Sequence, residues 1–241
     1  MTLDLSVVVP VFNEGENIEP LAGEITAALA YCHYEIVVVD DGSTDDTAAA
    51  VRRARENCGP HIRLLRHAQR AGQSAAIYSG IAAARADWIA TLDGDGQNDP
   101  ADIPHLIAAR QARGNAEVKL VMGDRIARHD SWLRRAESRL ANDMRRGLLG
   151  DGSRDSGCGI KLISRDTFLA LPRFDHMHRF LPALCQRAGA RVISVPVNHR
   201  LRTHGESKYG LFDRLWVGLC DLVGVMWLQR RRIEALEVRE E

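Results

Sequence analysis

Four short apolar segments between residues 5 and 92 alternate with longer segments of helical character, and this alternation limits the folds open to the chain. The apolar segments are rich in β-branched residues, which is typical of buried strands. Strands of this kind, each followed by a helix, form a parallel sheet covered by helices on both faces. We therefore predict an α/β fold with a mainly parallel central sheet flanked by helices. The predicted strands are Leu5–Val11, Glu35–Val39, Ile62–Arg66 and Trp88–Leu92, and the helices between them cover 16–30, 47–56 and an alanine-rich segment that ends near Ala84.

The second half of the chain continues this pattern less regularly. We predict a helix at 103–113, a strand at 119–122, a basic helical region at 130–150, a turn and strand from Gly157, a short helix at 166–171, a strand at 191–196, a loop at 198–210 and a terminal helix. The chain shows no repeat, low-complexity segment or linker. Residues 1–210 are therefore expected to form one domain, and residues 211–241 a C-terminal amphipathic helix with a basic tail.

The composition is that of a soluble globular protein, with 45% hydrophobic and 27% charged residues in a chain of 241. The formal net charge is zero, so we expect no nucleic-acid partner. The five cysteines are odd in number and include no C-x-x-C pair, which argues against a zinc site or a disulfide framework and favours the cytoplasm. The N-terminus lacks a basic region, so no signal peptide is expected. The apolar run 215–228 is too short to cross a bilayer.

Three polar segments, 13–16, 40–46 and 93–99, follow predicted strands at the edge where ligands bind in such sheets. Asp93, Asp95 and Gln97 alternate, so in an extended segment their side chains would point to one face. Their oxygens suit a hard divalent cation, Mg²⁺ or Mn²⁺. An ordinary Asp-Gly turn is the alternative, and the convergence of the three segments favours the metal. A calcium loop of the EF-hand type is excluded, since it needs glycine in place of Asn98 and glutamate in place of Pro104.

Other polar and basic residues also suit a nucleotide ligand. Asn13 and Glu14 could bind a base or ribose, or simply begin a helix, and Asp40 or Asp41 could bind a nucleoside or lie in a surface turn. Ser43 or Asp45 is suited to cap the helix that begins at Thr47. Cationic side chains that could hold a diphosphate are Arg125 and, in a loop able to close over phosphates, Arg202 and Lys208. That loop could equally be a solvated surface segment.

Several further features are weaker. Gly157 and Gly159 lack the third glycine of a dinucleotide fingerprint, and neither a nucleophile elbow nor a Walker A loop is present. His176 and His178 could lie near an acceptor, but we favour structural or surface roles for them. The arginines of the basic region could form a second anion patch, although a solvated helix face is the favoured interpretation for most of Arg134, Arg135, Arg139, Arg145 and Arg146.

Four motifs in this order resemble the family 2 glycosyltransferases, and most closely the dolichol-phosphate mannosyltransferase and polyprenyl-phosphate glycosyltransferase group. They are Pro10-Val-Phe-Asn-Glu, Val39-Asp-Asp-Gly-Ser, Asp93-Gly-Asp-Gly-Gln and Arg202-Thr-His-Gly-Glu-Ser-Lys-Tyr. The resemblance covers roughly residues 3–210 and implies a nucleotide-binding sandwich of the GT-A type. The sequence departs from the family at Cys158, where an aromatic residue is common, and at its end, where many relatives carry transmembrane helices.

The resemblance also implies roles for individual residues. The metal would be held by Asp93, Asp95 and Gln97, and the reaction would depend on Asp93, Asp95, Arg125 and Arg202. A further arginine for the acceptor phosphate would be Arg134, Arg135 or Arg139. The nucleotide would contact Pro10, Phe12, Asn13, Glu14, Val39, Asp40, Asp41, Asp93, Gly94, Asp95, Arg202 and Lys208.

We expect an inverting transfer of one sugar from a nucleotide sugar to a polyprenyl phosphate, dolichyl or undecaprenyl. A phosphate monoester has a second pKa of about 6 and attacks as a dianion, so no general base is needed. GDP-mannose is the first choice of donor by family analogy. The alternatives are a UDP-sugar carrying glucose, GlcNAc or a uronic acid, and a non-catalytic nucleotide-sugar-binding subunit of a membrane complex.

The C-terminal segment fits a lipid acceptor. Its apolar residues would cover one broad helical face, and Arg230 to Arg232 follow, which suits a helix in the membrane interface near anionic headgroups. A core or dimer helix is the alternative. We therefore expect a peripheral protein on the cytoplasmic face of the inner (plasma) membrane, with an integral-membrane partner or a homodimer as further options. The apolar face would consist of Phe212, Leu215, Trp216, Leu219, Val223, Met226 and Trp227.

Overall fold

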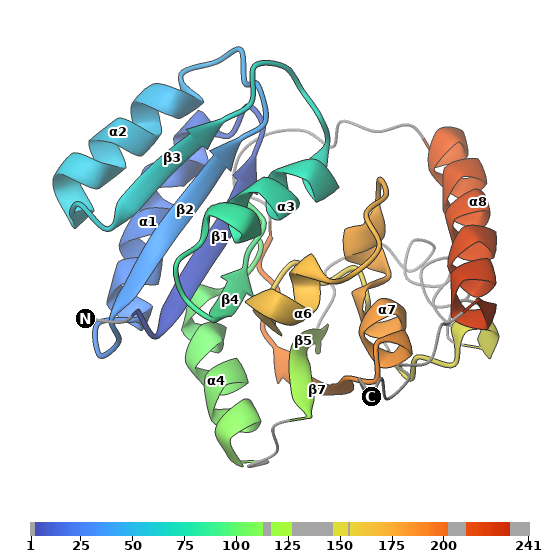
Figure 1. Cartoon of the computed structure of the whole chain (residues 1–241). Coiled ribbons are helices and arrows are strands. Elements are labelled where there is room, and N and C mark those ends of the chain that lie inside the picture. Colours follow the sequence, from blue (N-terminus) through green and yellow to red (C-terminus); the bar gives the residue numbers. More distant parts are fainter. Residues whose placement is uncertain (1–2, 113–116, 127–146, 154, 202–210, 232–241) are drawn as a thin grey trace, which may run out of the picture.

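The computed structural model describes residues 3–112, 117–126, 147–153, 155–201 and 211–231, and within them seven strands form one sheet (Figure 1). The strand order across the sheet is β3-β2-β1-β4-β6-β5-β7. The predicted α/β architecture with a central sheet is confirmed. The strands are β1 (Leu5–Val11), β2 (Tyr34–Asp40), β3 (Ile62–Arg66), β4 (Trp88–Thr91), β5 (Val118–Arg125), β6 (Lys161–Ser164) and β7 (Arg191–Val197).

The sheet is mainly parallel, as predicted, but β6 runs against its neighbours. It pairs antiparallel with β4 on one side and with β5 on the other. Because its direction is reversed, the start of β6 lies beside the end of β4, and Lys161 is the partner of Thr91. The chain that enters β6 therefore reaches the same edge of the sheet as the chain that leaves β4. The sequence did not indicate this reversal.

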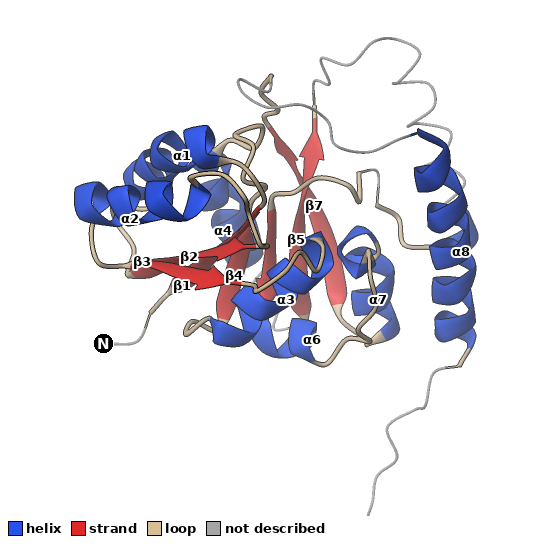
Figure 2. Cartoon of the chain, turned by 90° about the horizontal axis from the view of Figure 1, so that it is seen from above, coloured by secondary structure: helices blue, strands red, loops and turns tan. Residues whose placement is uncertain are grey.

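Helices cover both faces of the sheet (Figure 2). One face carries α1 (Gly15–Ala28), α2 (Thr47–Cys58) and α4 (Ile103–Ala112), and the other carries α3 (Gln73–Ala83), α6 (Arg165–Leu169) and α7 (Leu181–Arg187). The long helix α8 (Leu211–Arg230) lies outside α7. Two short 3₁₀ turns, η1 (Pro100–Asp102) and η2 (Met177–Arg179), complete the elements. Of these helices, α7 was not predicted from the sequence.

The two faces of the sheet make two cores, and this explains the continuous apolar strands. All seven residues of β1 are buried, with Val7 and Val9 packed against α1 and α2 and Val8 packed against α3. The approach of α3 depends on Gly80, because a side chain there would place its Cβ 2.9 Å from Cγ2 of Val39. A strand buried on both sides carries no polar alternation, as expected for this class of sheet.

A buried carboxylate ties the strands together at the edge opposite the candidate site. Glu35 is 3% exposed and accepts hydrogen bonds from Ser6 Oγ (2.7 Å) and the backbone N–H of Arg85 (2.7 Å). Arg63 completes the network through an ion pair of 2.6 Å. Burial alone would raise the pKa of Glu35, but these hydrogen bonds and the arginine charge lower it overall. The network joins β1, β2, β3 and the turn before β4.

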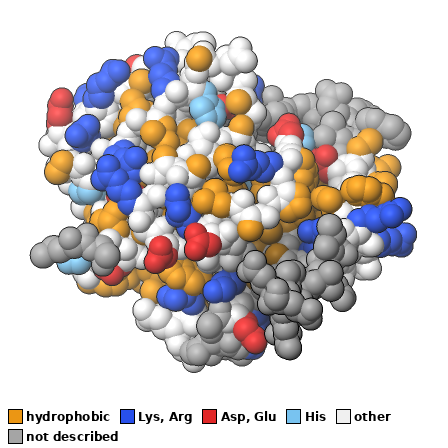
Figure 3. All heavy atoms as spheres, viewed as in Figure 1, with side chains coloured by type: hydrophobic (Ala, Val, Ile, Leu, Met, Phe, Trp, Pro, Cys, Tyr) orange, Lys and Arg blue, Asp and Glu red, His pale blue; other side chains and the backbone are white. Residues whose placement is uncertain are grey.

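Helix α8 has one buried and one exposed apolar face, judged from the side chains described beyond residue 217. Leu222 and Val225 pack into the core, whereas Leu219, Val223 and Trp227 are 50%, 58% and 59% exposed. Hydrophobic side chains gather over α8 at the right-hand edge of Figure 3, beside Lys and Arg side chains. No helix in the described ranges has the length and apolar character needed to cross a bilayer.

Candidate active site

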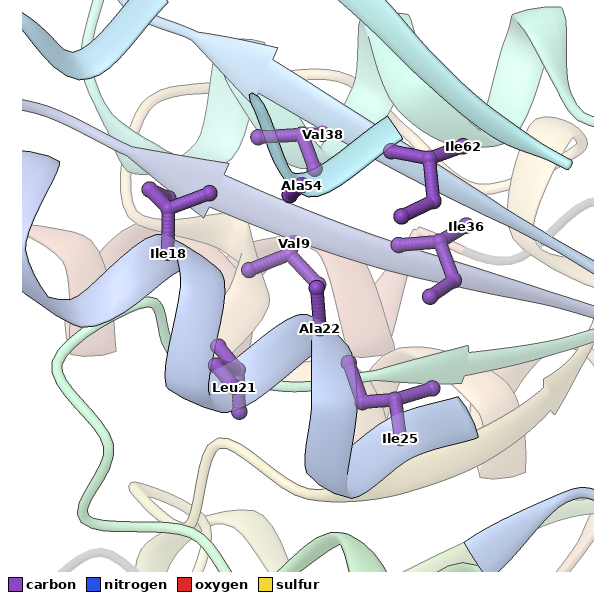
Figure 4. Close-up of a pocket in the computed structure, with 9 residues that line it drawn as sticks. All are labelled: Val9, Ile18, Leu21, Ala22, Ile25, Ile36, Val38, Ala54 and Ile62. Atoms are coloured by element: carbon purple, nitrogen blue, oxygen red, sulfur yellow. The ribbon is translucent and has the colours of Figure 1, made fainter. Parts of the chain in front are cut away.

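A small cavity lies on the α1 and α2 side of the sheet, away from the polar loops (Figure 4). Its volume is about 10 Å³, which is room for roughly one water molecule, and its lining is apolar. A cavity without polar partners stays dry, so we interpret it as a packing void. It is lined by Val9, Ile18, Leu21, Ala22, Ile25, Ile36, Val38, Ala54 and Ile62.

The loops that follow β1 and β2 are joined by hydrogen bonds. Asn13 adopts a left-handed conformation (φ 54°); its N–H donates to Ser43 Oγ (2.9 Å), and its Oδ1 accepts from the N–H of Thr44 (2.8 Å). Asp45, one of the two predicted caps, accepts from the N–H of Thr47 at the start of α2 (3.0 Å). The predicted ligand residue Asn13 thus uses its side chain to hold these loops together. A left-handed asparagine is tolerated because its short side chain bonds locally.

Glu14, the next residue, also contributes to this junction. Its N–H donates to Thr47 Oγ1 (3.0 Å), and its carboxylate accepts from Asn17 Nδ2 (2.7 Å). The predicted contacts Pro10 and Val39 are register partners on adjacent strands, and both are buried. Val39 is fully buried in the core beneath α3, so its side chain packs there.

The adjacent carboxylates Asp40 and Asp41 have different surroundings. Asp41 accepts hydrogen bonds from the N–H groups of Ala71 and Gly72 (both 2.8 Å) and contacts His67 Nδ1 (2.7 Å). It is therefore the anchor of the loop between β3 and α3. Asp40 is fully buried, and its Oδ1 accepts from the N–H of Ser43 (2.7 Å).

The second carboxylate oxygen of Asp40, Oδ2, is buried and differs from Oδ1 in its contacts. It lies 3.1 Å from Arg66 Nε but has no hydrogen-bond partner among the described residues. A buried acceptor of this kind is costly unless a ligand or water satisfies it. Nearby, the Arg70 guanidinium stacks 4.2 Å from the ring centre of Phe12, so the loops after β1 and β3 also meet.

The segment after β4 turns sharply, and the prediction that Asp93, Asp95 and Gln97 share a face of an extended segment is wrong. The chain bends at Gly96, which has a positive φ of 73°, and the N–H of Gln97 donates to Asp95 Oδ1 (3.1 Å). Asn98 folds back, and its Oδ1 accepts from the N–H of Asp93 (2.9 Å). Glycine permits this bend, since other residues rarely adopt positive φ.

The two carboxylates nevertheless remain close enough to repel one another. Burial, followed by the charge of Asp95, raises the pKa of Asp93 to about 6. Gln73, the first residue of α3, donates from Nε2 to Asp93 Oδ1 (2.8 Å). Gly94 packs on the end of β1, where an added Cβ would lie 3.1 Å from the carbonyl oxygen of Pro10. Two carboxylates that disfavour each other's charge suit a bound cation.

The backbone of the chain that enters β6 packs beside Asp93, a contact that was not predicted from the sequence. Thr91 Oγ1 donates to the carbonyl oxygen of Gly159 (2.7 Å), and this contact brings the backbone of Gly159 against the carboxylate. Lys161 is 4% exposed, and its Nζ donates to the carbonyl oxygen of Cys158. Burial lowers the pKa of Lys161, while its positive charge opposes the rise at Asp93. A lysine at the start of an apolar strand was the only sequence signal.

Arg125, predicted to bind phosphate, is held at the end of β5 by Asp155. Its Nε and Nη2 donate to the two carboxylate oxygens (2.5 and 2.8 Å). Burial opposes the charged form of Arg125, but the hydrogen bonds and charge of Asp155 raise its pKa above the usual value. The guanidinium is thus fixed in orientation, and Asp155 is a site residue that the sequence analysis did not single out.

The chain leaving β7 is attached to the loop after Asp95. The N–H of Arg200 donates to the carbonyl oxygen of Gln97 (2.9 Å), and its guanidinium bonds Asp99 (2.7 Å) and Glu24 (2.6 Å). Asn98 and His199 form an isolated backbone bridge beside it. The predicted phosphate ligands Arg202 and Lys208 lie outside the described residues, as do Arg134, Arg135, Arg139, Arg145 and Arg146.

The described residues fit a hard cation only in part. Within these ranges, no three His, Cys, Asp or Glu side chains gather into a metal site made by protein alone. The Asp93 and Asp95 carboxylates are present, however, and Mg²⁺ is commonly held by one or two carboxylates together with substrate phosphates and water. The arrangement is therefore suited to a metal that arrives with a phosphorylated ligand.

Comparison with known proteins gives consistent similarities. The signature of the glycosyl transferase family 2 matches residues 6–171. A dodecaprenyl-phosphate galacturonate synthase from Rhizobium johnstonii is 37% identical over 95% of this chain and 68% of its own length. An undecaprenyl-phosphate 4-deoxy-4-formamido-L-arabinose transferase from an Enterobacter species is 37% identical over 91% of this chain and 66% of its own. The chain thus spans about two thirds of the length of these relatives.

Solved structures support the fold. The glucosyl-3-phosphoglycerate synthase of Mycobacterium tuberculosis, crystallised with Mn²⁺, UDP-glucose and glycerol 3-phosphate, superposes with a TM-score of 0.71. The alignment covers 97% of this chain and 82% of that protein, at 20% identity. Another structure of the same enzyme contains Mg²⁺ and UDP, with a TM-score of 0.70 and 18% identity. At this identity the comparison establishes the GT-A-like fold and nothing more.

Proposed function

Because this chain belongs to glycosyl transferase family 2, we propose that it transfers one sugar, with inversion, from a nucleotide sugar to a polyprenyl phosphate. The observation that carries the proposal is the agreement of the relatives, whose names specify dodecaprenyl or undecaprenyl phosphate at 34% to 37% identity. The loops at the carboxyl edge of the sheet support it, since they bring Asp40, Asp93 and Asp95 to one side of the molecule.

The donor is better described as a UDP-sugar than as GDP-mannose, the first choice from the sequence. The names of the relatives specify galacturonate and 4-deoxy-4-formamido-L-arabinose as the sugars, and the structural relative was crystallised with UDP-glucose. Asp40 Oδ2 lies 3.1 Å from Arg66 Nε but makes no hydrogen bond among the described residues, so it could accept the ring N–H of a base, which both uracil and guanine possess. It therefore supports a nucleotide ligand without distinguishing the two.

The metal would be Mg²⁺ or Mn²⁺, held by Asp93 and Asp95, with Gln97 as a further ligand. When bound, it would neutralise charge on the departing diphosphate. Arg125, Arg202 and Lys208 would hold phosphate oxygens of the donor or acceptor. The acceptor dianion would attack the sugar without a general base, so positioning and electrostatics would supply the rate enhancement.

The exposed stripe of Leu219, Val223 and Trp227 on α8, followed by Arg230 and Arg231, suits a lipid surface. We propose that the protein works at the cytoplasmic face of the membrane, where α8 would bring the site to its lipid acceptor. A non-catalytic nucleotide-sugar-binding subunit is the competing function.

The decisive experiment combines a donor panel with one variant. Purified protein is incubated with Mn²⁺, undecaprenyl phosphate and UDP-galacturonate, UDP-glucose or GDP-mannose, and the lipid product is measured by mass spectrometry. We expect a lipid-linked sugar from a UDP donor, and its loss in Asp95→Ala without a change in Tm. Asp166→Ala, at an exposed position on α6, is the control. Donor binding without any lipid-linked product would support the competing function.

A further inference from the structure

The segment around η2 lies between helix α3, whose first residue contacts Asp93, and helix α8. His178 is bound twice to Ser74: its Nδ1 lies 2.7 Å from Ser74 Oγ, and its backbone N–H donates to the same oxygen (3.4 Å). Ser74 is the neighbour of Gln73, which donates to Asp93 Oδ1 (2.8 Å). The imidazole is therefore attached to the residue next to a direct contact of the candidate metal carboxylate.

The other side of this segment is attached to α8. His176 Nδ1 lies 3.1 Å from the Asp221 carboxylate of that helix. The segment thus occupies the side of the site that faces the helix with the exposed apolar stripe (Figure 1). A lipid-borne phosphate that enters from the α8 side would meet this segment as it approaches the donor.

The chemical state of His178 suits a hydrogen-bond donor. Burial, and then the nearby charges of Lys161, Arg179 and His176, hold the pKa of its imidazole well below the usual value, so the ring is neutral at physiological pH. A serine oxygen that accepts one N–H keeps its own proton, which it can donate to Nδ1. The remaining ring proton then resides on Nε2.

The ring nitrogen opposite the Ser74 contact, Nε2, is the second polar atom of the His178 imidazole. His178 as a whole residue is partly exposed, and in the described part of the chain no side chain or backbone group accepts a hydrogen bond from Nε2. Lys161, whose charge also lowers the pKa of Asp93, is one of the charges that lower the pKa of the His178 imidazole. A neutral donor beside these cations fits a phosphate oxygen.

We propose that His178 contacts the acceptor: its Nε2 donates a hydrogen bond to a terminal oxygen of the phosphate monoester as the acceptor approaches the sugar. This assignment rests on the proposed function and deepens it by naming an acceptor residue. Ser74 is the positioning residue that sets the orientation of the ring. No proton is transferred, because the phosphate already attacks as a dianion.

The test compares His178→Asn, which can retain the Ser74 contact but removes the distal donor, with His178→Gln, which can place an N–H near the Nε2 position. We expect His178→Asn to lower kcat/KM for undecaprenyl phosphate by about 100-fold. The Kd for UDP with Mn²⁺, and the slow hydrolysis of the donor without acceptor, should stay within about twofold of wild type. His178→Gln should recover at least about a tenth of the lost activity.

His176→Asn is the matched control, since it changes a histidine on the same segment, and asparagine tolerates the left-handed conformation at that position (φ 60°). Its acceptor kinetics should match those of wild type. Unchanged acceptor kinetics in His178→Asn, or a parallel loss of UDP binding, would overturn the assignment while the proposed function stands. A wild-type protein that forms no lipid-linked sugar would overturn both.

Discussion

Replacing Gly159 by alanine tests whether the position of Asp93 controls activity. The backbone of Gly159 lies so close to this carboxylate that an added Cβ would overlap Oδ2 and would lie 2.5 Å from Asn98 Oδ1. Gly159 does not require positive φ, so alanine fits its backbone conformation, and the three atoms nearest to the added Cβ all belong to the side chains of Asp93 and Asn98. Both oxygens would have to move by about 1 Å to restore van der Waals contact.

A displacement of about 1 Å at a catalytic group can reduce the rate about 100-fold, which corresponds to about 2.7 kcal/mol of transition-state stabilisation. We therefore expect Gly159→Ala to lower kcat/KM about 100-fold and to weaken Mn²⁺ binding in the presence of UDP. Overpacking of this kind destabilises a fold by about 1 to 3 kcal/mol, so the variant should remain folded. Initial rates, calorimetric Mn²⁺ titration and thermal unfolding measure the three quantities.

Gly157→Ala is the matched control in the same loop. An added Cβ there would lie 3.8 Å from Arg125 Nη2 and 3.9 Å from Asp155 Oδ1, which are ordinary contacts. Its activity and metal affinity should stay close to those of wild type. If Gly159→Ala retains kcat/KM within about threefold, a shift of Asp93 is not limiting, and the reasoning is refuted.

Two further predictions concern stability and surface binding. Glu35→Gln should destabilise the fold at pH 7 by about 2 kcal/mol, because Arg63 loses its buried partner. The pKa of Glu35 is lowered in the folded protein, so its contribution to stability is present above the unfolded pKa and is lost as the pH falls through the folded pKa. The free energies of unfolding of wild type and variant, measured in urea, should therefore converge in acid. Convergence toward high pH would contradict this. A triple variant with serine in place of Leu219, Val223 and Trp227 should keep the Tm of wild type, because these side chains are exposed, but should bind anionic vesicles about tenfold or more weakly in a sedimentation assay. Equal binding of the two proteins would refute the lipid-surface role of α8.

The sequence predicted the sheet well where strands are buried on both sides. Runs such as Leu5–Val11 are apolar except for Ser6 and end in polar loops, so their type and extent follow from local residues. Helix α7 was missed because it has only seven residues and begins with Leu181 and Pro182, too short for a periodic pattern. The reversed direction of β6 depends on pairing with strands far away in the chain, which local patterns do not report.

The sequence predicted which edge of the sheet the polar segments reach, but not the backbone conformation of the segment that contains Asp93 and Asp95. The polar segments after β1, β2 and β4 do reach one edge of the sheet, as inferred from parallel topology. The assumed extended shape of the Asp93 segment failed, because Gly96 allows a bend that the side chain of Asn98 then holds. The site contacts of Gly159 and Asp155 could not be found by spacing, since each is made with a residue at least 30 positions away.

The attachment of Arg200 to the loop after Asp95 has a consequence for how the protein forms during synthesis. Residues 97–99 emerge from the ribosome about a hundred positions before their partner Arg200, which follows β7 in the chain. The nascent chain can thus assemble β1 to β4 early, while the carboxylate loop still lacks the contacts that brace it. We expect the loop to acquire its final shape late, once the last strand is in place.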